Sequence, residues 1–418
     1  MNRKEAPEYL QAKDLPLILP EEIELQNGVR LFWMKDVKDD SVKMEVLWDA
    51  GTKHQQKSLQ ASFTNKLLLS GSKERSAKQI SEALDYYGGY VQKELDKDHA
   101  GISVYGLNEH IADIFGIIQN ALATVSFEEN ELQKELSIGK NRFKVDTQKV
   151  NILSRRAFTK QLFGEDAPYG QVAELADFEQ LKREDLLAYY DRFYYQSPVI
   201  FLTGNVSQAF IEVLRTWSVN FRQEEIVMKK QQFSPTIGRV DVPKKEALQS
   251  AIRIGRLMFD KKHEDYYPFQ LLNTIFGGYF GSRLMTNIRE DKGYTYGVGS
   301  GMSVLADAGY LFVATEVGSD VKELAVKEIY HEMQRLQTEL IPYEELEKVK
   351  NYMLGEFQRN ADGPLSMMEM FKNIYFNELP KTYYSDFIQA IHQVTPEQLR
   401  TLAEKYLQQD EMLEVIAG

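Results

Sequence analysis

An arginine and two tyrosines within eight residues form the segment of the sequence that is best suited to chemistry. Arg289 is followed by a turn residue, Gly293, and then by Tyr294 and Tyr296. A helix that ends near Arg289 and a strand over 294–302 would bring Arg289 and Tyr296 toward one point. A guanidinium and a phenol together supply several N–H and O–H donors, which can hold peptide carbonyl oxygens and stabilise negative charge on them. Spacing alone leaves open the alternative of a surface arginine beside a core tyrosine.

Side chains that bind metal ions are sparse. The chain has no cysteine and six histidines, and no two of these histidines lie three to five residues apart. No single helix or turn can therefore present a histidine pair to one ion. His331-Glu332 begins like the helix motif of a zinc peptidase, but Arg335 stands where the second histidine is expected, and its permanent charge repels a metal ion. We expect no metal-hydrolase centre and no cofactor in this chain.

Composition narrows the classes of partner. The net charge of −12 would repel a phosphate backbone, so nucleic acid is not an expected partner. No apolar run approaches the roughly 18 residues that a membrane span needs, and the first residues lack the apolar stretch of a signal peptide. We therefore expect a soluble, cytoplasmic protein with no membrane partner.

Hydrophobic periodicity and turn residues indicate alternating strands and helices. In the first half, Asn27-Gly28 is typical of a hairpin turn. Strands are expected there at 42–49, 90–95, 100–106 and 199–203, and helices at 58–70, 76–87, 108–124, 128–145, 150–163 and 181–193. In the second half, strands are expected at 248–258, 294–302, 308–316 and 412–416, and helices at 264–276, 281–290, 320–338, 342–358, 364–376 and 395–406.

The two halves match each other in sequence. Residues 181–186 match 394–399 at an offset of 213, and Glu131-Leu132 matches Glu345-Leu346 at an offset of 214. These offsets are close to half of the chain, which is typical of a duplicated domain.

The sequence therefore predicts an α+β fold with two homologous lobes. The N-terminal lobe is expected over 1–222 and the C-terminal lobe over 237–418, with a polar linker at 223–236 between them. Each lobe would be a mostly antiparallel sheet packed with helices. The two lobes would face each other as a clamshell.

The arginine/tyrosine segment resembles a motif of the pitrilysin and insulinase zinc-metallopeptidase family, which includes proteins like mitochondrial processing peptidase. Members carry R-E-x-x-G-hydrophobic-x-Y in the C-terminal lobe, matched here by Arg289, Glu290, Gly293 and Tyr296. The likeness covers essentially the whole chain and includes Asn27-Gly28, Asp49–Gly51, Leu69–Ser72, Gly88-Gly89 and Pro168–Gly170. The resemblance implies the same duplicated, two-lobed fold.

The resemblance fails where the family binds zinc. Catalytic members carry H-x-x-E-H on the helix before the segment matched by Leu69–Ser72, where two histidines bind zinc and the glutamate activates water. Those three positions hold Ser62, Asn65 and Lys66, and the third zinc ligand of the family, a glutamate, falls near Asn141. Serine and amide side chains are poor zinc ligands, and an ammonium group repels the ion. The resemblance thus implies a degenerate metal site.

By this resemblance, the chain would be the non-catalytic, substrate-binding subunit of a heterodimeric zinc metallopeptidase. A homologous H-x-x-E-H subunit would hold the zinc, while Arg289 and Tyr296 would hold an unstructured peptide beside that zinc. The alternative is a catalytically inactive structural or peptide-binding homodimer of the same fold.

Overall fold

The computed structural model describes residues 17–35, 37–224 and 231–418. Within these residues the chain forms two sheets. The first sheet has the strand order β1-β2-β6-β3-β5-β4, and the second has the order β7-β11-β8-β10-β9. The strands are β1 (Glu21–Glu24), β2 (Arg30–Met34), β3 (Ser41–Trp48), β4 (Tyr90–Leu95), β5 (Ala100–Leu107), β6 (Val199–Thr203), β7 (Gly238–Val242), β8 (Gln249–Met258), β9 (Val298–Val304), β10 (Gly309–Gly318) and β11 (Leu413–Ala417).

The two sheets share one topology. In each sheet one pair of neighbouring strands is parallel, β2 with β6 and β7 with β11. The other neighbours are antiparallel. Lowering each strand number of the second sheet by five gives β2-β6-β3-β5-β4, which is the first sheet without its edge strand β1. The predicted α+β fold of two homologous lobes is confirmed.

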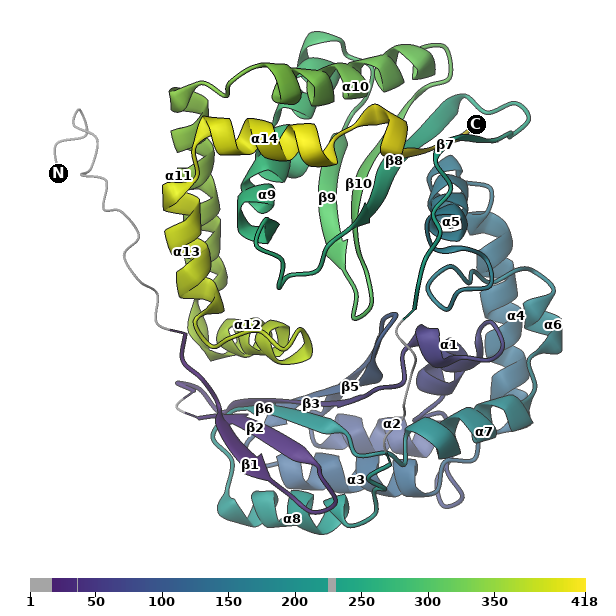
Figure 1. The fold of residues 1–418 in the computed structure, drawn as a ribbon. Helices are drawn as coiled ribbons and strands as arrows, with labels where there is room; N and C mark the ends of the chain where they lie inside the picture. The colour runs from purple at the N-terminus through teal and green to yellow at the C-terminus, as the bar shows by residue number, and fades with distance from the viewer. Residues whose placement is uncertain (1–16, 36, 225–230) are drawn as a thin grey trace, which may run out of the picture.

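Helices cover the sheets and connect them. Helices α2, α3 and α8 pack against the first sheet, whereas α9, α10 and α14 pack against the second (Figure 1). The α-helices are α1 (Gln60–Lys66), α2 (Ala77–Tyr86), α3 (Ile111–Ala123), α4 (Glu129–Asp146), α5 (Val150–Phe163), α6 (Asp177–Gln180), α7 (Arg183–Phe193), α8 (Gln208–Ser218), α9 (Tyr266–Asn273), α10 (Lys322–Thr338), α11 (Tyr343–Asn360), α12 (Gly363–Phe376), α13 (Tyr383–Gln393) and α14 (Pro396–Tyr406).

Each half of the chain lends one helix to the sheet of the other half. Phe158 of α5 packs in a cluster with Val415 of β11, and Phe371 of α12 packs on Phe32 of β2 with the ring centroids 4.8 Å apart. The two helices have the same length of 14 residues and begin 213 residues apart, at positions 150 and 363. The offset found in the sequence therefore relates two helices that pack in equivalent ways.

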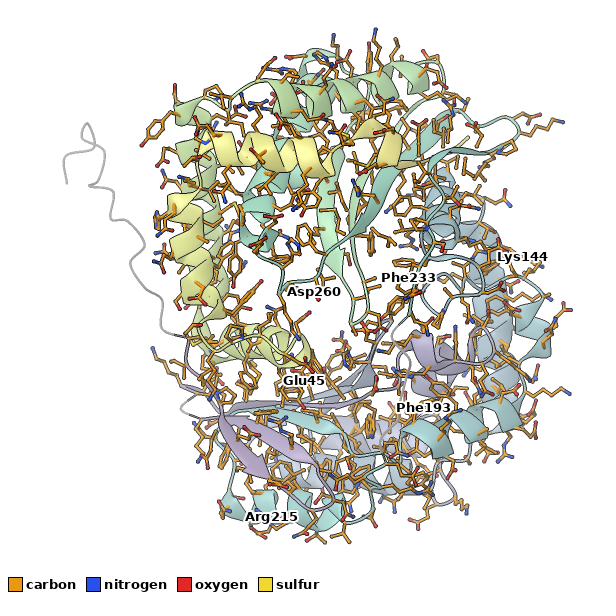
Figure 2. The ribbon with its side chains drawn as sticks, viewed as in Figure 1. Glu45, Lys144, Phe193, Arg215, Phe233 and Asp260 are labelled. Atoms are coloured by element: carbon orange, nitrogen blue, oxygen red, sulfur yellow. The ribbon has the colours of Figure 1, made fainter. Side chains whose placement is uncertain are left out.

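A charged network also fastens α12 to the first sheet. Glu45 of β3, only 3% exposed, accepts a hydrogen bond from Lys372 of α12 at 2.7 Å and lies 3.1 Å from the ammonium of Lys43 (Figure 2). Glu369 of α12 pairs with both lysines, at 2.7 and 2.9 Å. Burial opposes the charge on Lys43, but Glu369 and Glu45 outweigh it and raise the pKa of Lys43. Two carboxylates and two ammonium groups thus balance each other at the junction.

Several elements were absent from the sequence-based prediction. These are β7, α6, α8 and α13. The hairpin turn was predicted correctly, because Asn27 and Gly28 both have positive φ, 53° and 72°, as a type I′ turn requires. Part of the expected linker, 225–230, lies outside the described residues, as do the first 16 residues. Within the described part of the chain, no helix combines the length and the apolar character that crossing a membrane requires.

Candidate functional site

Arg289 lies on a short π-helix, Met285–Asp291, and not on the ordinary helix that was expected at 281–290. The amide of Lys292 donates to the carbonyl of Asn287 at 3.0 Å, which is the five-residue spacing of a π-helix. The side chain of Arg289 stacks on Phe280, with its guanidinium carbon 4.7 Å from the ring centroid. Phe280 is itself 66% exposed, so the pair is presented at the surface.

Tyr296 lies before the strand on which it was predicted. The expected strand over 294–302 begins only at Val298, so the prediction is wrong for its first residues. The reason is the side chain of Thr295, whose hydroxyl donates to the carbonyl of Glu316 at 2.7 Å and accepts from the amide of Gly297 at 3.1 Å. These bonds replace the regular strand pairing at this point. Tyr296 is consequently left 96% exposed.

Arg289 and Tyr296 have different surroundings. Tyr296 lines a hollow of about 470 Å³ together with Ser154 of α5 and Arg253 of β8, and Arg289 is not among the residues that line it. The convergence of these two side chains on one point stays a prediction. Both residues precede β9 in the C-terminal lobe, with Tyr296 exposed and Arg289 half-buried.

At the family's zinc position, two of the three side chains of α1 serve the fold. The hydroxyl of Ser62 donates to the carbonyl of Leu59 at 3.0 Å. Asn65 is 2% exposed, and both ends of its amide are used. Its Nδ2 donates to the carbonyl of Glu94 in β4 at 2.7 Å, and its Oδ1 accepts from the hydroxyl of Tyr194 at 2.9 Å. The amide thereby ties α1 to an edge strand and to the residue that follows α7.

The third side chain, Lys66, forms an ion pair with Glu135 of α4. Burial lowers the pKa of the neighbouring Lys93; Glu135 opposes this shift and the charge of Lys66 adds to it. Asn141, expected near this group, lies on α4 with an exposed side chain, whereas Glu135, six residues earlier, meets Lys66. Sequence reasoning missed Glu135, because the residue of α4 that faces Lys66 depends on how α4 packs beside α1.

These residues do not fit a zinc ion. Ser62 and Asn65 are engaged in hydrogen bonds, and the ammonium of Lys66 already supplies the positive charge that Glu135 balances. Across residues 17–35, 37–224 and 231–418, no group of three or more His, Cys, Asp or Glu side chains is placed to hold a metal ion. The side chains of α1 at these positions therefore support no catalytic step that uses a metal ion bound to this chain.

We expect the purified chain to retain no stoichiometric zinc. Metal analysis after dialysis against trace zinc measures this, with a homologous H-x-x-E-H subunit dialysed in parallel as the positive control. The reason is chemical: an amide, a hydroxyl and an ammonium stand where imidazoles and a carboxylate would be required. About one tightly held ion per chain would contradict the prediction.

The two lobes also meet at a polar junction around Asp98. Tyr169, fully buried, donates a hydrogen bond to Asp98 at 2.5 Å, and the amide of Ala306 in the β9–β10 turn donates to the same carboxylate at 3.0 Å. Lys53 lies 3.1 Å from it. Burial alone would raise the pKa of Asp98, but these partners outweigh burial and hold it below its usual value. A charged Asp98 therefore links the first lobe to the hairpin of the second.

Comparisons with known proteins agree with this two-lobed architecture. The family described as "Insulinase (Peptidase family M16)" matches residues 30–166, and the one described as "Peptidase M16 inactive domain" matches residues 180–353. An uncharacterized zinc protease, YmxG of Bacillus subtilis, is 26% identical over 404 residues, covering 94% of this chain and 97% of the relative. An uncharacterized zinc protease of Rickettsia bellii is 27% identical over 351 residues, covering 80% of this chain and 82% of the relative.

Solved structures share the fold. The peptidase M16 inactive domain from Pseudomonas fluorescens superposes with a TM-score of 0.85 at 20% identity, covering 96% of this chain and 98% of that chain. A protease from Helicobacter pylori superposes with a TM-score of 0.85 at 16% identity, covering 96% of this chain and 100% of that chain. At these identities the likeness establishes the fold.

Proposed function

Because the chain belongs to the insulinase (peptidase M16) family but lacks side chains that fit a zinc ion at the family's site, we propose that it is a non-catalytic, peptide-binding subunit. This proposal rests on the hydrogen bonds that the side chain of Asn65 makes. Its buried amide is committed to Tyr194 and Glu94 at the position of the family's catalytic glutamate. A side chain that holds the fold in this way does not activate water.

The C-terminal lobe supports the peptide-binding half of the proposal. Tyr296 is exposed just before β9, which is an edge strand of the second sheet, and the exposed ring of Phe280 stacks with the half-buried Arg289. An extended peptide can add to an edge strand by backbone hydrogen bonds while neighbouring side chains contact it. The guanidinium of Arg289 and the hydroxyl of Tyr296 can then donate hydrogen bonds to the carbonyl oxygens of that peptide.

A partner subunit would supply the zinc ion and the residues that activate water. In the proposed complex a homologous subunit supplies H-x-x-E-H and the zinc, and the present chain holds an unstructured peptide against it. Self-association into an inactive homodimer is the competing arrangement. The two arrangements differ in whether adding an H-x-x-E-H subunit creates or raises peptidase activity.

We expect the isolated chain not to cleave unstructured peptides and to restore or raise cleavage when it is mixed with its H-x-x-E-H partner. Hydrolysis of a quenched fluorescent peptide measures both, with size-exclusion chromatography to report the assembly. A chelator should abolish the activity of the mixture. Chelator-sensitive hydrolysis by the contaminant-free chain alone would refute the proposal. A stable homodimer that leaves the partner's activity unchanged would favour the structural alternative.

A further inference from the structure

A second cavity adjoins the hollow that Tyr296 lines. Its volume is about 420 Å³, which falls among pockets that bind small ligands, at about 300–1,000 Å³. Its apolar walls include Phe158 of α5 and Tyr310 of β10. Four cationic side chains also line it: Lys97, Arg155, Arg156 and Arg253. This gathering of positive charge lies in a protein whose net charge is −12.

Two of the four cations already have partners. Arg156 pairs with Glu174 at 3.0 Å. The ammonium of Lys97 donates to the carbonyl of Tyr169 at 3.0 Å. Burial lowers the pKa of Lys97, and the nearby charge of Asp98 opposes that shift.

Within the described residues, the other two cations have no counterion. Arg155 and Arg253 form no ion pair or hydrogen bond within the described part of the chain, and the Nε of Arg253 is buried without an acceptor. The guanidinium of Arg253 lies over the rings of Phe158 and Phe312, at 5.9 and 5.5 Å. Burial lowers the pKa of Arg253; Tyr310 opposes this shift, and the charge of Arg155 adds to it. Buried donors without an acceptor and neighbouring like charges are both unfavourable, and one anion would relieve both.

We propose that this cavity binds a carboxylate of an extended peptide through Arg253 and Arg155. The carboxylate would belong to an acidic side chain or to the C-terminus of the peptide. A guanidinium presents paired N–H donors with the spacing of two carboxylate oxygens, which makes arginine suited to this ligand. The inference rests on the proposed peptide-binding function and adds a preference for acidic peptides.

Continuity between the two cavities favours a peptide as the ligand. Arg253 lines both, and α5 borders both, with Ser154 at the hollow of Tyr296 and Phe158 at the cationic cavity. At 1.5 Å per helical residue, these two positions lie about 6 Å apart along α5. An extended peptide covers that distance in about two residues. A peptide that lies in the hollow of Tyr296 can therefore reach the cationic cavity within two or three residues along α5.

Equilibrium binding of the full chain to matched fluorescent peptides tests the inference. One unstructured peptide is compared as free acid and as C-terminal amide, and with its acidic residues as Asp or as Asn. We expect at least one carboxylate form to bind about tenfold more tightly than its neutral counterpart. This advantage should shrink as salt is raised. The overall negative charge of the chain would repel an acidic peptide. A preference for carboxylate peptides would therefore have to come from the cationic side chains of the cavity.

Substitutions of single arginines test whether the preference for carboxylate peptides arises in this cavity. Arg155→Gln alters an exposed side chain, and Arg253→Gln alters the stacked one. Each should reduce the preference to within about twofold. Arg142→Gln on α4 removes the same charge from a side chain that is 84% exposed and should leave the preference unchanged. Arg155→Gln keeps the test decisive if Arg253→Gln impairs folding.

Each contrary result has its own meaning. Equal binding of acidic and neutral peptides would overturn the inference and leave the proposed function intact. No binding of any peptide would overturn both. An equal loss of preference in Arg142→Gln would overturn the inference by showing a general charge effect. Competition by inorganic phosphate, without any preference for carboxylate peptides, would overturn it in favour of a small-anion site.

Discussion

Tyr296→Phe is expected to lower the turnover of the complex formed with the H-x-x-E-H subunit by about 10²–10³, the usual effect of losing one donor to a developing oxyanion. The substitution removes only the hydroxyl. Because Tyr296 is 96% exposed, it contributes little to the core, and the stability and assembly of the chain should not change. The effect should fall on kcat if the donor acts only in the transition state, and on KM if it merely holds the peptide.

Two companion variants and one control sharpen this experiment. Arg289→Lys keeps the charge but loses the planar fork, and it should also impair turnover. Phe280→Leu removes the ring on which Arg289 stacks and should produce a smaller loss in the same direction. Tyr294→Phe removes the same hydroxyl from a half-buried neighbour and should have no effect on turnover. Unchanged kcat and KM in both Tyr296→Phe and Arg289→Lys would favour the structural homodimer.

Glu45→Gln is expected to destabilise the protein by about 3–5 kcal/mol, because it leaves two largely buried ammonium groups to share the single carboxylate of Glu369. Glu45 is nearly fully buried and receives the charge of both Lys372 and Lys43. The amide keeps the shape of the side chain, so packing of α12 on the first sheet is not directly disturbed. Denaturant unfolding monitored by fluorescence measures the loss, and transitions should be analysed separately if the two lobes unfold in steps.

Glu369→Gln is the matched control for this network. It removes a carboxylate from the same two lysines, but its side chain is 51% exposed, and solvent can replace it. The expected loss is no more than about 1 kcal/mol. If Glu45→Gln costs as little as Glu369→Gln, the network is not what holds α12 against the sheet, and the apolar contacts of Phe371 and Met368 would then account for the attachment.

The sequence by itself determined the duplication, the turn at Asn27-Gly28 and the poor fit of Ser62, Asn65 and Lys66 to a zinc ion. Each depends on information that is local along the chain. The offset of 213 recurs in α5 and α12 because the same pattern of helix and strand is written twice. Asn27-Gly28 forms its turn because those two residues tolerate positive φ. The misfit at Ser62, Asn65 and Lys66 follows from side-chain chemistry alone.

Only the tertiary structure decided which residues meet. The exchange of α5 and α12 between the sheets, and the pairing of Lys66 with Glu135, depend on how apolar faces from distant segments pack. The start of β9 was missed because the hydroxyl of Thr295 competes for backbone bonds in a segment whose residue pattern is that of a strand. The cationic cavity joins Arg155 to Arg253 from segments 98 residues apart in sequence (155 and 253), so no local pattern could have indicated it.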